Sequence, residues 1–388
     1  MLLTVAVFSA TSAFGSPASR ERTQQAYALA YDLQFDRCYA ALADAMAMDP
    51  LDPAPHRAMA SLAWIEILFA QGVATFEAFT GEISKDDVVR PTVPPALAAR
   101  FHQELEVATT LSNLPAATRN QADAAYQAGA NAIVSSLYSA TVEGRTLGAF
   151  GDARRAVNAM ARARGLAPGK PEPALVLGMS EYTISTMSWP VRSLARLKGL
   201  SGNRERGLAL MREAAAPGAE TRTDALLLLM VIDNREGRHT DATRRLTELK
   251  LAHPGNRLLW LNHGATALEA DDPIEADRVL SERLADGCRT ATPAVLGETA
   301  MWFAHRGAAR VRRHQLAEAE VDLRRALAAE PRDWISGRAH AQLGIIELRR
   351  GNPDQARRDF ESALAFAERG GDAAAARDAR RQLRVRRS

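Results

Sequence analysis

The chain has 388 residues, of which 47% are hydrophobic and 24% charged, a composition that excludes an intrinsically disordered protein. The net charge is only +3 and basic residues are interleaved with acids, so we predict no nucleic-acid partner. Two cysteines, Cys38 and Cys288, are too few for a disulfide framework or a zinc site. Because alanine, leucine, arginine and glutamate dominate, and these residues lose little entropy in a helix, we expect an all-α fold.

The first segment in chain order is a short apolar run at residues 1–15. Ala13 and Gly15 flank Phe14 in the small-x-small pattern of a signal cleavage site, and polar sequence begins shortly after Ser16. The basic residues that usually begin a secretory signal are missing. We therefore predict a signal peptide over 1–15 and a periplasmic or secreted protein, with an ordinary apolar helix end and a cytoplasmic location as the alternative.

The remainder of the chain contains an internal repeat marked by small residues. These small positions are Ala156, Gly207, Ala242, Ala276, Ala319 and Ala356. Successive intervals are 51, 35, 34, 43 and 37 residues, and several are at or near the 34-residue period of tetratricopeptide repeats. Each such repeat consists of two antiparallel helices, so the pattern predicts an α-solenoid.

The residues around each small position support the same interpretation. Large apolar residues follow four positions later: Met160, Met211, Leu246, Leu280, Leu323 and Phe360. Seven positions later the chain has Ala163, Ala214, Leu249, Ala326 and Ala363, with Arg283 as a departure. Positions i, i+4 and i+7 share one helix face, so this face is predicted to pack against neighbouring helices. Cys38, Leu42, Ala45 and Pro50 form an earlier copy.

Each predicted pair also has a first helix and a stop signal. Glycines stand twelve positions before the small position, at Gly144, Gly264, Gly307 and Gly344. Bulky residues precede two of these glycines by four positions, at Trp260 and Phe303. Closing prolines follow at Pro168, Pro254 and Pro331, where a helix must end.

The segment GNRERG has the glycine spacing of a phosphate-binding loop. Leu208 follows Gly207 where such a loop requires lysine, so the segment cannot hold a nucleotide in that way. Gly169-Lys170 also imitates part of the motif, but Pro171 follows where serine or threonine is required. We predict instead that Gly202 ends a helix in a left-handed or cramped conformation, and that Gly207 is the small contact residue of the next helix.

The chain resembles tetratricopeptide-repeat proteins over most of residues 20–368, which implies an all-α superhelix of antiparallel helix pairs. Residues 177–215 show a narrower likeness to the tetratricopeptide repeat domain 39 family, related to a yeast inclusion-body-clearance protein. The residues that carry it are Gly178, Pro190, Gly199, Gly202, Arg204, Gly207 and Leu208. This resemblance implies an interaction or adaptor protein and brings no catalytic residues with it.

The repeat pattern divides the chain. We predict helix pairs over 20–71 and 101–368, an irregular insertion over 72–100, and a basic C-terminal capping helix or tail over 369–388. Pro91, Pro94 and Pro95 interrupt any helix in the insertion, which either guards a groove or forms a surface excursion. The arginine-rich 369–388 suits a polar cap better than a nucleic-acid tail.

A basic amphipathic stretch lies at 185–198 and carries Arg192, Arg196 and Lys198. Such a stretch can lie on an anionic membrane, but it can equally be a spacer helix that lengthens the 51-residue interval. No stretch approaches the roughly 20 apolar residues of a membrane span. We expect no stable span and leave peripheral membrane contact open.

The sequence shows no catalytic, metal or cofactor site. There is no His-Glu-x-x-His motif, and His305 and His314 are nine positions apart, which places them on different faces of a helix. Polar residues on first helices, Asn131, Asn234 and Asn262, could hydrogen-bond a peptide, although no ligand-binding residue is singled out.

We therefore predict a non-enzymatic scaffold that binds a protein or peptide partner on the concave face of the solenoid. The alternatives are an accessory or cryptic enzyme with a pocket under residues 72–100, and a cytoplasmic regulatory repeat module. The sequence does not specify the identity of the partner or the oligomeric state.

Overall fold

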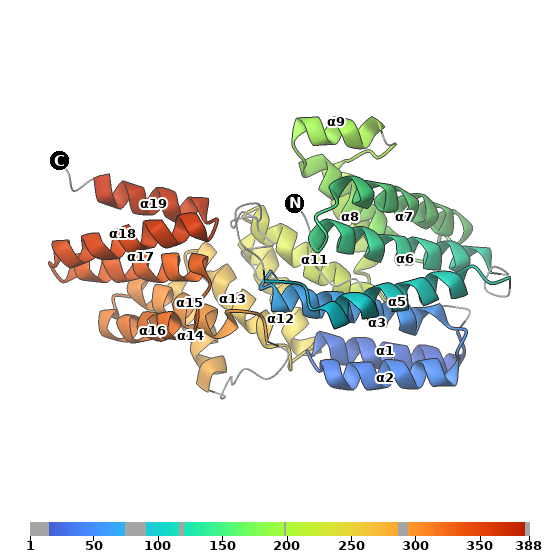
Figure 1. Ribbon diagram of the computed structural model, residues 1–388, viewed down its shortest axis with the longest axis horizontal. Helices are drawn as coiled ribbons and strands as arrows, with labels where there is room; N and C mark the ends of the chain where they lie inside the picture. Colours follow the sequence, from blue (N-terminus) through green and yellow to red (C-terminus); the bar gives the residue numbers. More distant parts are fainter. Residues whose placement is uncertain (1–14, 74–90, 116–119, 198, 286–293, 385–388) are drawn as a thin grey trace. The chain divides into compact units, whose positions relative to one another are not determined.

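The elements that the chain forms are α-helices throughout the described residues (Figure 1). The structure is a computed structural model that describes residues 15–73, 91–115, 120–197, 199–285 and 294–384. Its helices are α1 (Pro17–Tyr31), α2 (Phe35–Met48), α3 (Pro53–Ala70), α5 (Pro95–Ser112), α6 (Gln121–Thr141), α7 (Thr146–Leu166), α8 (Pro173–Thr186), α9 (Trp189–Leu197), α10 (Arg204–Ala214), α11 (Arg222–Arg235), α12 (His239–Ala252), α13 (Arg257–Glu269), α14 (Pro273–Ala285), α15 (Glu298–Arg312), α16 (Leu316–Ala328), α17 (Asp333–Arg349), α18 (Pro353–Arg369) and α19 (Ala373–Arg384). The all-α prediction is confirmed.

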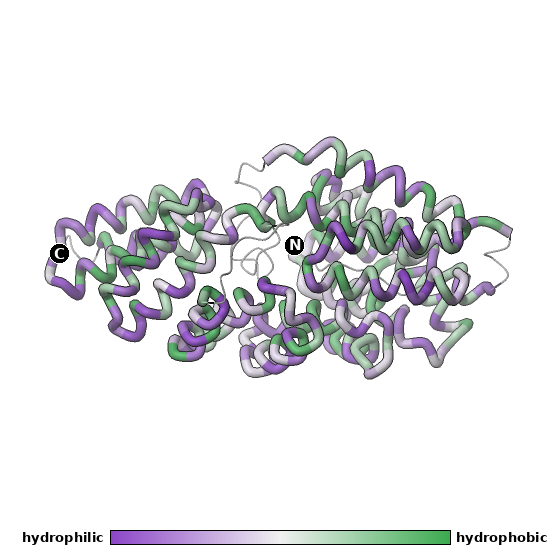
Figure 2. Tube along the Cα trace, turned by 90° about the horizontal axis from the view of Figure 1, so that it is seen from below, coloured by the Kyte–Doolittle hydropathy of each residue, from purple (hydrophilic) through white to green (hydrophobic). Residues whose placement is uncertain are grey.

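The chain forms two compact units. The first unit comprises Met1–Leu68 and Val93–Leu229, and the second comprises Phe69–Thr92 and Met230–Ser388. In the first unit the closely packed pairs are α1 with α2, α6 with α7, and α8 with α10. In the second unit they are α13 with α14, α15 with α16, and α17 with α18. These antiparallel pairs give each unit a tetratricopeptide-like fold, as the repeat predicts. Figure 2 shows hydrophobic and hydrophilic residues alternating along the helices, as amphipathic packing requires.

The predicted small positions are buried helix contacts. Ala156, Ala242, Ala276, Ala319 and Ala356 have no exposed surface, and Gly207 is buried as well. The large apolar residues four positions later are also buried, from Met160 at 0% to Phe360 at 1% exposure. Because a small side chain sits on one turn and a large one on the next, the facing helix can approach closely at the first and interlock with the second.

Glycines of the first helices receive those large side chains. A Cβ atom added at Gly264 would lie 2.5 Å from Leu280, and one at Gly307 would lie 2.8 Å from Leu323. The same contact joins Gly344 to Phe360, again at 2.8 Å. The repeated pairing shows that the space a glycine leaves in one helix is filled by the large apolar residue of the next.

The prediction for Gly144 is wrong. Gly144 lies between α6 and α7 with φ +68°, and nothing lies within 4 Å of its added Cβ. The residue in the equivalent contact is Gly129, whose added Cβ would lie 3.0 Å from Met160. Both α6 and α7 are 21 residues long, so a spacing of twelve residues does not reach back far enough into the first helix.

The GNRERG segment leads from α9 into α10, but the prediction that Gly202 ends a helix is wrong, because α9 ends at Leu197. Gly202 is cramped, since an added Cβ would collide with the backbone of Ile184 and Ser185. Gly207 lies against the backbone of α8, with its added Cβ 2.7 Å from the Tyr182 nitrogen. The sequence suggests that Gly202 is either left-handed or cramped. The structure has the cramped backbone at Gly202 and the left-handed conformation at Gly199, with φ +74°.

The predicted insertion at 72–100 ends earlier than expected. Helix α5 begins at Pro95, because proline is well accommodated in the first turn, where its missing N–H has no intrahelical partner. Residues 74–90 lie outside the described residues. At the start of the insertion, the Leu296 backbone nitrogen donates to the Phe69 oxygen at 2.9 Å, and Arg332 donates to the Gly72 oxygen at 2.5 Å. These bonds hold Phe69–Val73 within the second unit.

The two ends of the chain are described in part. Residues 1–14, which contain nearly all of the predicted signal peptide, lie outside the described residues, and that segment stays a prediction. Helix α1 begins directly afterwards, with the Ser16 hydroxyl accepting from the Ser19 backbone nitrogen. At the C-terminus, α18 extends to Arg369 and α19 packs on it through Ala376 and Ala379. No helix in the described part of the chain is both long and apolar enough to cross a membrane.

The glycine contacts give a stability prediction. Gly264→Ala places a methyl group against Leu280 and is expected to destabilise the chain by about 1–3 kcal/mol through overpacking. Gly151→Ala is the matched control, because Gly151 lies in α7 with nothing within 4 Å of its added Cβ. The control should stabilise by about 0.5–1 kcal/mol, since alanine is the better helix former. Chemical denaturation distinguishes them, and equal effects would contradict the glycine contact.

A buried ion pair in the second unit gives a further prediction. Arg257 donates twice to Glu298, at 2.5 and 2.9 Å, and their side chains are 6% and 1% exposed. Arg257→Met leaves the buried carboxylate without its guanidinium and should cost about 3–5 kcal/mol. The double variant Arg257→Met/Glu298→Gln should recover part of this loss. Arg244→Met, which removes an exposed ion pair with Asp241, should cost less than about 1 kcal/mol in the same denaturation assay.

Candidate functional site

The second unit contains a groove of about 580 Å³, which we call the α13–α19 groove. It is lined by residues of α13, α15, α17 and α19, which follow one another through contacts of α13 with α15, α15 with α17, and α17 with α19. The first three of these helices are the first helices of their pairs. The second helices α14, α16 and α18 pack against them, and Phe360 is the one residue that these second helices contribute to the lining.

The lining of the groove is rich in alanine. Its alanines are Ala265, Ala304, Ala308, Ala341, Ala374, Ala375 and Ala379. Larger apolar side chains, among them Met301, Ile335 and Ile345, extend the apolar surface, and Gln342 and His305 add hydrogen-bonding groups. Because alanine side chains leave the helix backbones accessible, the groove can admit a bulky partner side chain between neighbouring helices.

The charges along the α13–α19 groove are mostly neutralised by neighbours. Arg338 donates to Asp372 at 2.7 Å, and Arg381 donates to Asp378 at 2.8 Å. Arg312 donates to the Leu268 carbonyl oxygen at 2.6 Å. Arg338 is held by a fully buried carboxylate, so it attracts a free anion less than an unpaired arginine would, whereas the exposed Arg381–Asp378 pair only balances charge locally. The groove therefore combines an apolar floor with fixed polar groups, which suits a neutral or amphipathic ligand.

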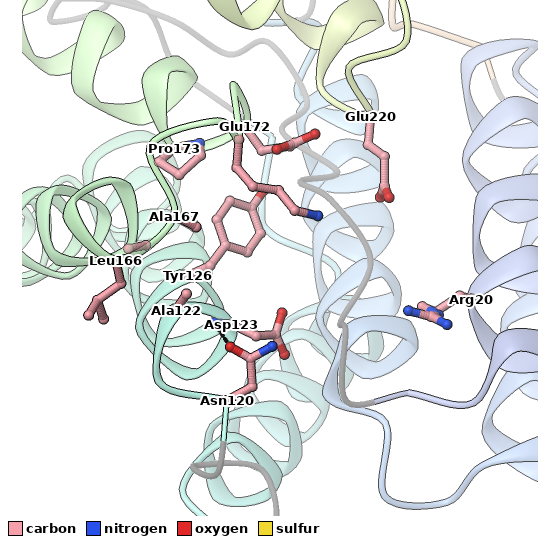
Figure 3. Close-up of a pocket in the computed structure, with 12 residues that line it drawn as sticks. Arg20, Asn120, Ala122, Asp123, Tyr126, Leu166, Ala167, Glu172, Pro173 and Glu220 are labelled. Carbon is pink, nitrogen blue, oxygen red and sulfur yellow. Dashed lines mark hydrogen bonds between the residues drawn. The ribbon is translucent and has the colours of Figure 1, made fainter.

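The first unit contains a smaller cavity of about 330 Å³ (Figure 3). The N-terminal turn of α6, the end of α7 and the beginning of α8 form one side of it, and Arg20 and Glu220 border the other. Asn120 caps α6, where its side-chain oxygen accepts from the Asp123 nitrogen at 3.2 Å. Asp123, Glu172 and Glu220 outnumber the basic residues Arg20 and Lys170 in the lining, so this cavity favours a cationic group. Among the described residues, no three histidine, cysteine, aspartate or glutamate side chains are placed so that they could hold one metal ion.

The predicted peptide-binding asparagines are not brought together. Asn131 is buried in the first unit, where it donates to the Ser112 hydroxyl at 3.1 Å. Asn234 is buried and contacts the Met230 sulfur at 3.5 Å, and Asn262 is half-buried. None of the three lines the α13–α19 groove, although Asn131 borders another cavity, of about 480 Å³, between α5, α6 and α7. Contacts within the protein explain the presence of Asn131 and Asn234 without a peptide ligand.

The sequence reasoning missed the groove residues, with Ala304, Ala308 and Arg312 as an example. They are spaced by four residues on α15 and so share one face of that helix. From this face Ala308 packs beside Ala267 and Leu268 of α13. The available signal on α15 was the pair of small residues Ala304 and Ala308, whereas α13 and α17 line the groove mostly with larger residues. His305 does line the groove, whereas His314 follows the end of α15 with φ +61°.

Titratable groups whose pKa values are shifted form a cluster on α12, α13 and α14. Of these helices, α13 also lines the groove. The Lys250 Nζ donates to the His263 Nδ1 at 2.6 Å and lies 4.3 Å from the centre of the Trp260 ring. Burial, and then the positive charge of Lys250, lower the pKa of His263 to about 4. Burial also lowers the pKa of Lys250. The cluster joins successive helix pairs through a neutral imidazole.

The His263 shift predicts a pH dependence of stability. Since the pKa of His263 falls from 6.5 in the unfolded chain to about 4 in the folded one, the unfolded chain binds more protons between these values. Stability should therefore fall as the pH drops from 6.5 towards 4, by up to about 3 kcal/mol from this residue. His263→Gln keeps an acceptor for Lys250 and should flatten that part of the profile, measured by denaturation at several pH values. An unchanged slope would contradict the shift.

Comparisons with known proteins give a likeness of fold. No sequence-family model and no curated protein matches the chain. Among solved structures, the human IFIT1 dimer with PPP-AAAA is 13% identical, with a TM-score of 0.47, and the match covers 91% of this chain and 69% of that one. A monomeric IFIT1 mutant with Gppp-AAAA is 14% identical, with a TM-score of 0.34, and the match covers 86% of this chain and 67% of that one.

These structures correct one prediction. The prediction that excludes nucleic acid as a partner is wrong as a general exclusion, because proteins with a similar fold are solved with PPP-AAAA and Gppp-AAAA. The likeness to the tetratricopeptide repeat domain 39 family finds no match in these comparisons.

Proposed function

We propose that the chain is a non-enzymatic scaffold that binds a peptide segment of a protein partner in the α13–α19 groove. The observation that carries the proposal is the groove itself, a hollow of about 580 Å³ lined by residues of four successive helices. Its alanine-rich floor accepts apolar side chains, and its fixed polar groups can orient the peptide. Binding of an amphipathic helix in a groove uses this combination of features.

The character of the groove favours a peptide that is largely apolar on one face. The Arg338–Asp372 and Arg381–Asp378 pairs leave little net charge to attract a polyanion, while the Gln342 amide lies near the apolar floor and can hydrogen-bond a peptide. The resemblance of residues 177–215 to an adaptor family supports a role in assembling partners. A cytoplasmic regulatory module would use the same groove, so that alternative differs in location and not in binding chemistry.

The enzyme alternative places a pocket under residues 72–100, most of which lie outside the described residues. The first-unit cavity is one place in the described part of the chain where carboxylates and basic groups border one space. No serine, threonine or cysteine lines it, so a binding role explains this cavity with fewer assumptions than acyl-transfer chemistry would. We keep export to the periplasm or the medium as a proposal, which fractionation of cells that express the full-length gene would test.

Peptides selected from a displayed library on the purified full chain provide the ligand for the binding test. Ala341 is half-buried in the lining of the groove on α17, and Ala341→Arg should fill the hollow and lower affinity about tenfold or more. Ala365→Arg is the matched control, because Ala365 is exposed on the second helix α18 and should leave affinity unchanged. Fluorescence anisotropy with a labelled selected peptide measures both.

Two outcomes would overturn the proposal. Equal affinity of both variants for the selected peptides would place the binding surface outside the groove. A single-stranded oligonucleotide that binds the chain more tightly than every selected peptide, and loses affinity in Ala341→Arg, would make nucleic acid the ligand of this groove.

A further inference from the structure

Helix α9 interrupts a helix pair of the first unit. It lies in sequence between α8 and α10, which pack closely against each other. Figure 1 shows α9 at the edge of the first unit, with its closest neighbour in α8. The pair is complete without α9, so the nine residues of this helix form an appendage that the repeat does not require.

One side of α9 is firmly held. Ala195 is fully buried and packs in a cluster with Ile184 and Leu200, against which Phe150 and Val157 also lie. The helix ends in a hydrogen-bonded cap, where the Leu200 nitrogen donates to the Ala195 oxygen at 3.0 Å and the Gly199 nitrogen donates to the Arg196 oxygen at 2.9 Å. This cap and the apolar contact of Ala195 fix the rotation of α9 about its axis.

The other side of α9 exposes large apolar side chains. Trp189 is 71% exposed and Leu197 is 84% exposed. Val191 is one turn before Ala195 and so belongs to the held side. Single exposed apolar residues are normal on a protein surface. Two that are largely exposed on the same side of one nine-residue helix, one of them a tryptophan, form a patch that suits a partner.

The surroundings of this patch are basic. Arg192 and Arg196 are one turn apart on α9, and the guanidinium of Arg154 from α7 lies beside Gly199. Within the part of the chain that the structure describes, none of these three arginines forms an ion pair. The sequence has no acidic residue between Glu181 and Glu205. The patch is therefore apolar at its centre and positively charged at its border.

We propose that α9 docks the chain on the surface of an anionic phospholipid membrane. Trp189 and Leu197 enter the boundary between headgroups and acyl chains, where tryptophan is favoured, and the arginines contact lipid phosphates. The charge complementarity selects an anionic surface, and the exposed apolar side chains select a lipid over a nucleic acid. An oligonucleotide could pair with the arginines, but it would leave Leu197 in water.

Trp189 provides a built-in reporter for this docking. Of the five tryptophans, Trp64, Trp302 and Trp334 are buried, Trp260 is half-buried, and Trp189 alone is exposed. Adding vesicles of equal parts phosphatidylglycerol and phosphatidylcholine to the full chain should shift its emission to shorter wavelength. Phosphatidylcholine with brominated acyl chains, in the same mixture, should quench the shifted emission. Vesicles of phosphatidylcholine alone should produce neither effect.

Substitutions on α9 separate the apolar and the charged contributions in vesicle co-sedimentation. Arg192→Gln/Arg196→Gln should weaken binding roughly 25-fold, at about fivefold for each arginine. Trp189→Ala/Leu197→Ala should weaken it about tenfold or more. Leu251→Ala/Ile274→Ala is the matched apolar control, because these residues are 80% and 68% exposed on other helices, and it should bind as the wild type does. Arg235→Gln/Arg377→Gln is the matched charge control. It removes two arginines that lie outside α9, and it should also bind as the wild type does.

Absence of binding to the anionic vesicles would overturn the proposal. So would a loss of binding in Arg235→Gln/Arg377→Gln equal to that in the α9 arginine variant, since this would show attraction by overall charge. Unchanged binding of Trp189→Ala/Leu197→Ala would exclude insertion of α9. An oligonucleotide that shifts Trp189 emission without vesicles would assign the patch to nucleic acid. Peptide binding in the α13–α19 groove is tested separately and does not depend on any of these results.

Discussion

The close approach of two helices within each pair is the constraint on which the rest of the structure depends. A glycine or other small residue in one helix faces a large apolar side chain in the other, as Gly264 faces Leu280 and Gly344 faces Phe360. Because protein interiors are packed as densely as organic crystals, such contacts fix both the distance and the rotation of the helices. Repetition of this contact produces the stack of pairs in each unit.

Fixing one face of each first helix leaves its other face for a different use. In the second unit the free faces of α13, α15 and α17, together with α19, line one continuous groove. Polar contacts tie neighbouring pairs together beside it, because Arg310 of α15 donates both to Asp322 of α16 and to Asp277 of α14. The Asp322 side chain is 1% exposed and also accepts from Arg306. Leaving such a carboxylate unpaired would be costly, so these contacts hold the neighbouring pairs in register.

The first unit departs from this regularity at α9. The repeat tolerates an added helix there because α8 and α10 still meet through Gly178 and Gly207, whose backbones approach closely enough to exclude a Cβ atom. The insertion is anchored by the single small residue Ala195, which leaves most of the surface of the helix uncovered. Because α8 and α10 pack against each other without α9, the surface of α9 is not constrained by their packing. Its apolar and basic character is therefore not required by the fold.

The sequence by itself determined the helix pairs, because small and large residues at spacings of four and seven can bury one face only as helices packed against helices. It also identified the buried positions of Ala156 through Ala356. The tertiary structure decided the contacts between residues that lie far apart in the sequence. Gly129 replaces Gly144 because the lengths of α6 and α7 set which turns meet, and Asn131 is used inside the first unit. The groove residues come from four separate helices, and no local pattern shows which of their faces converge.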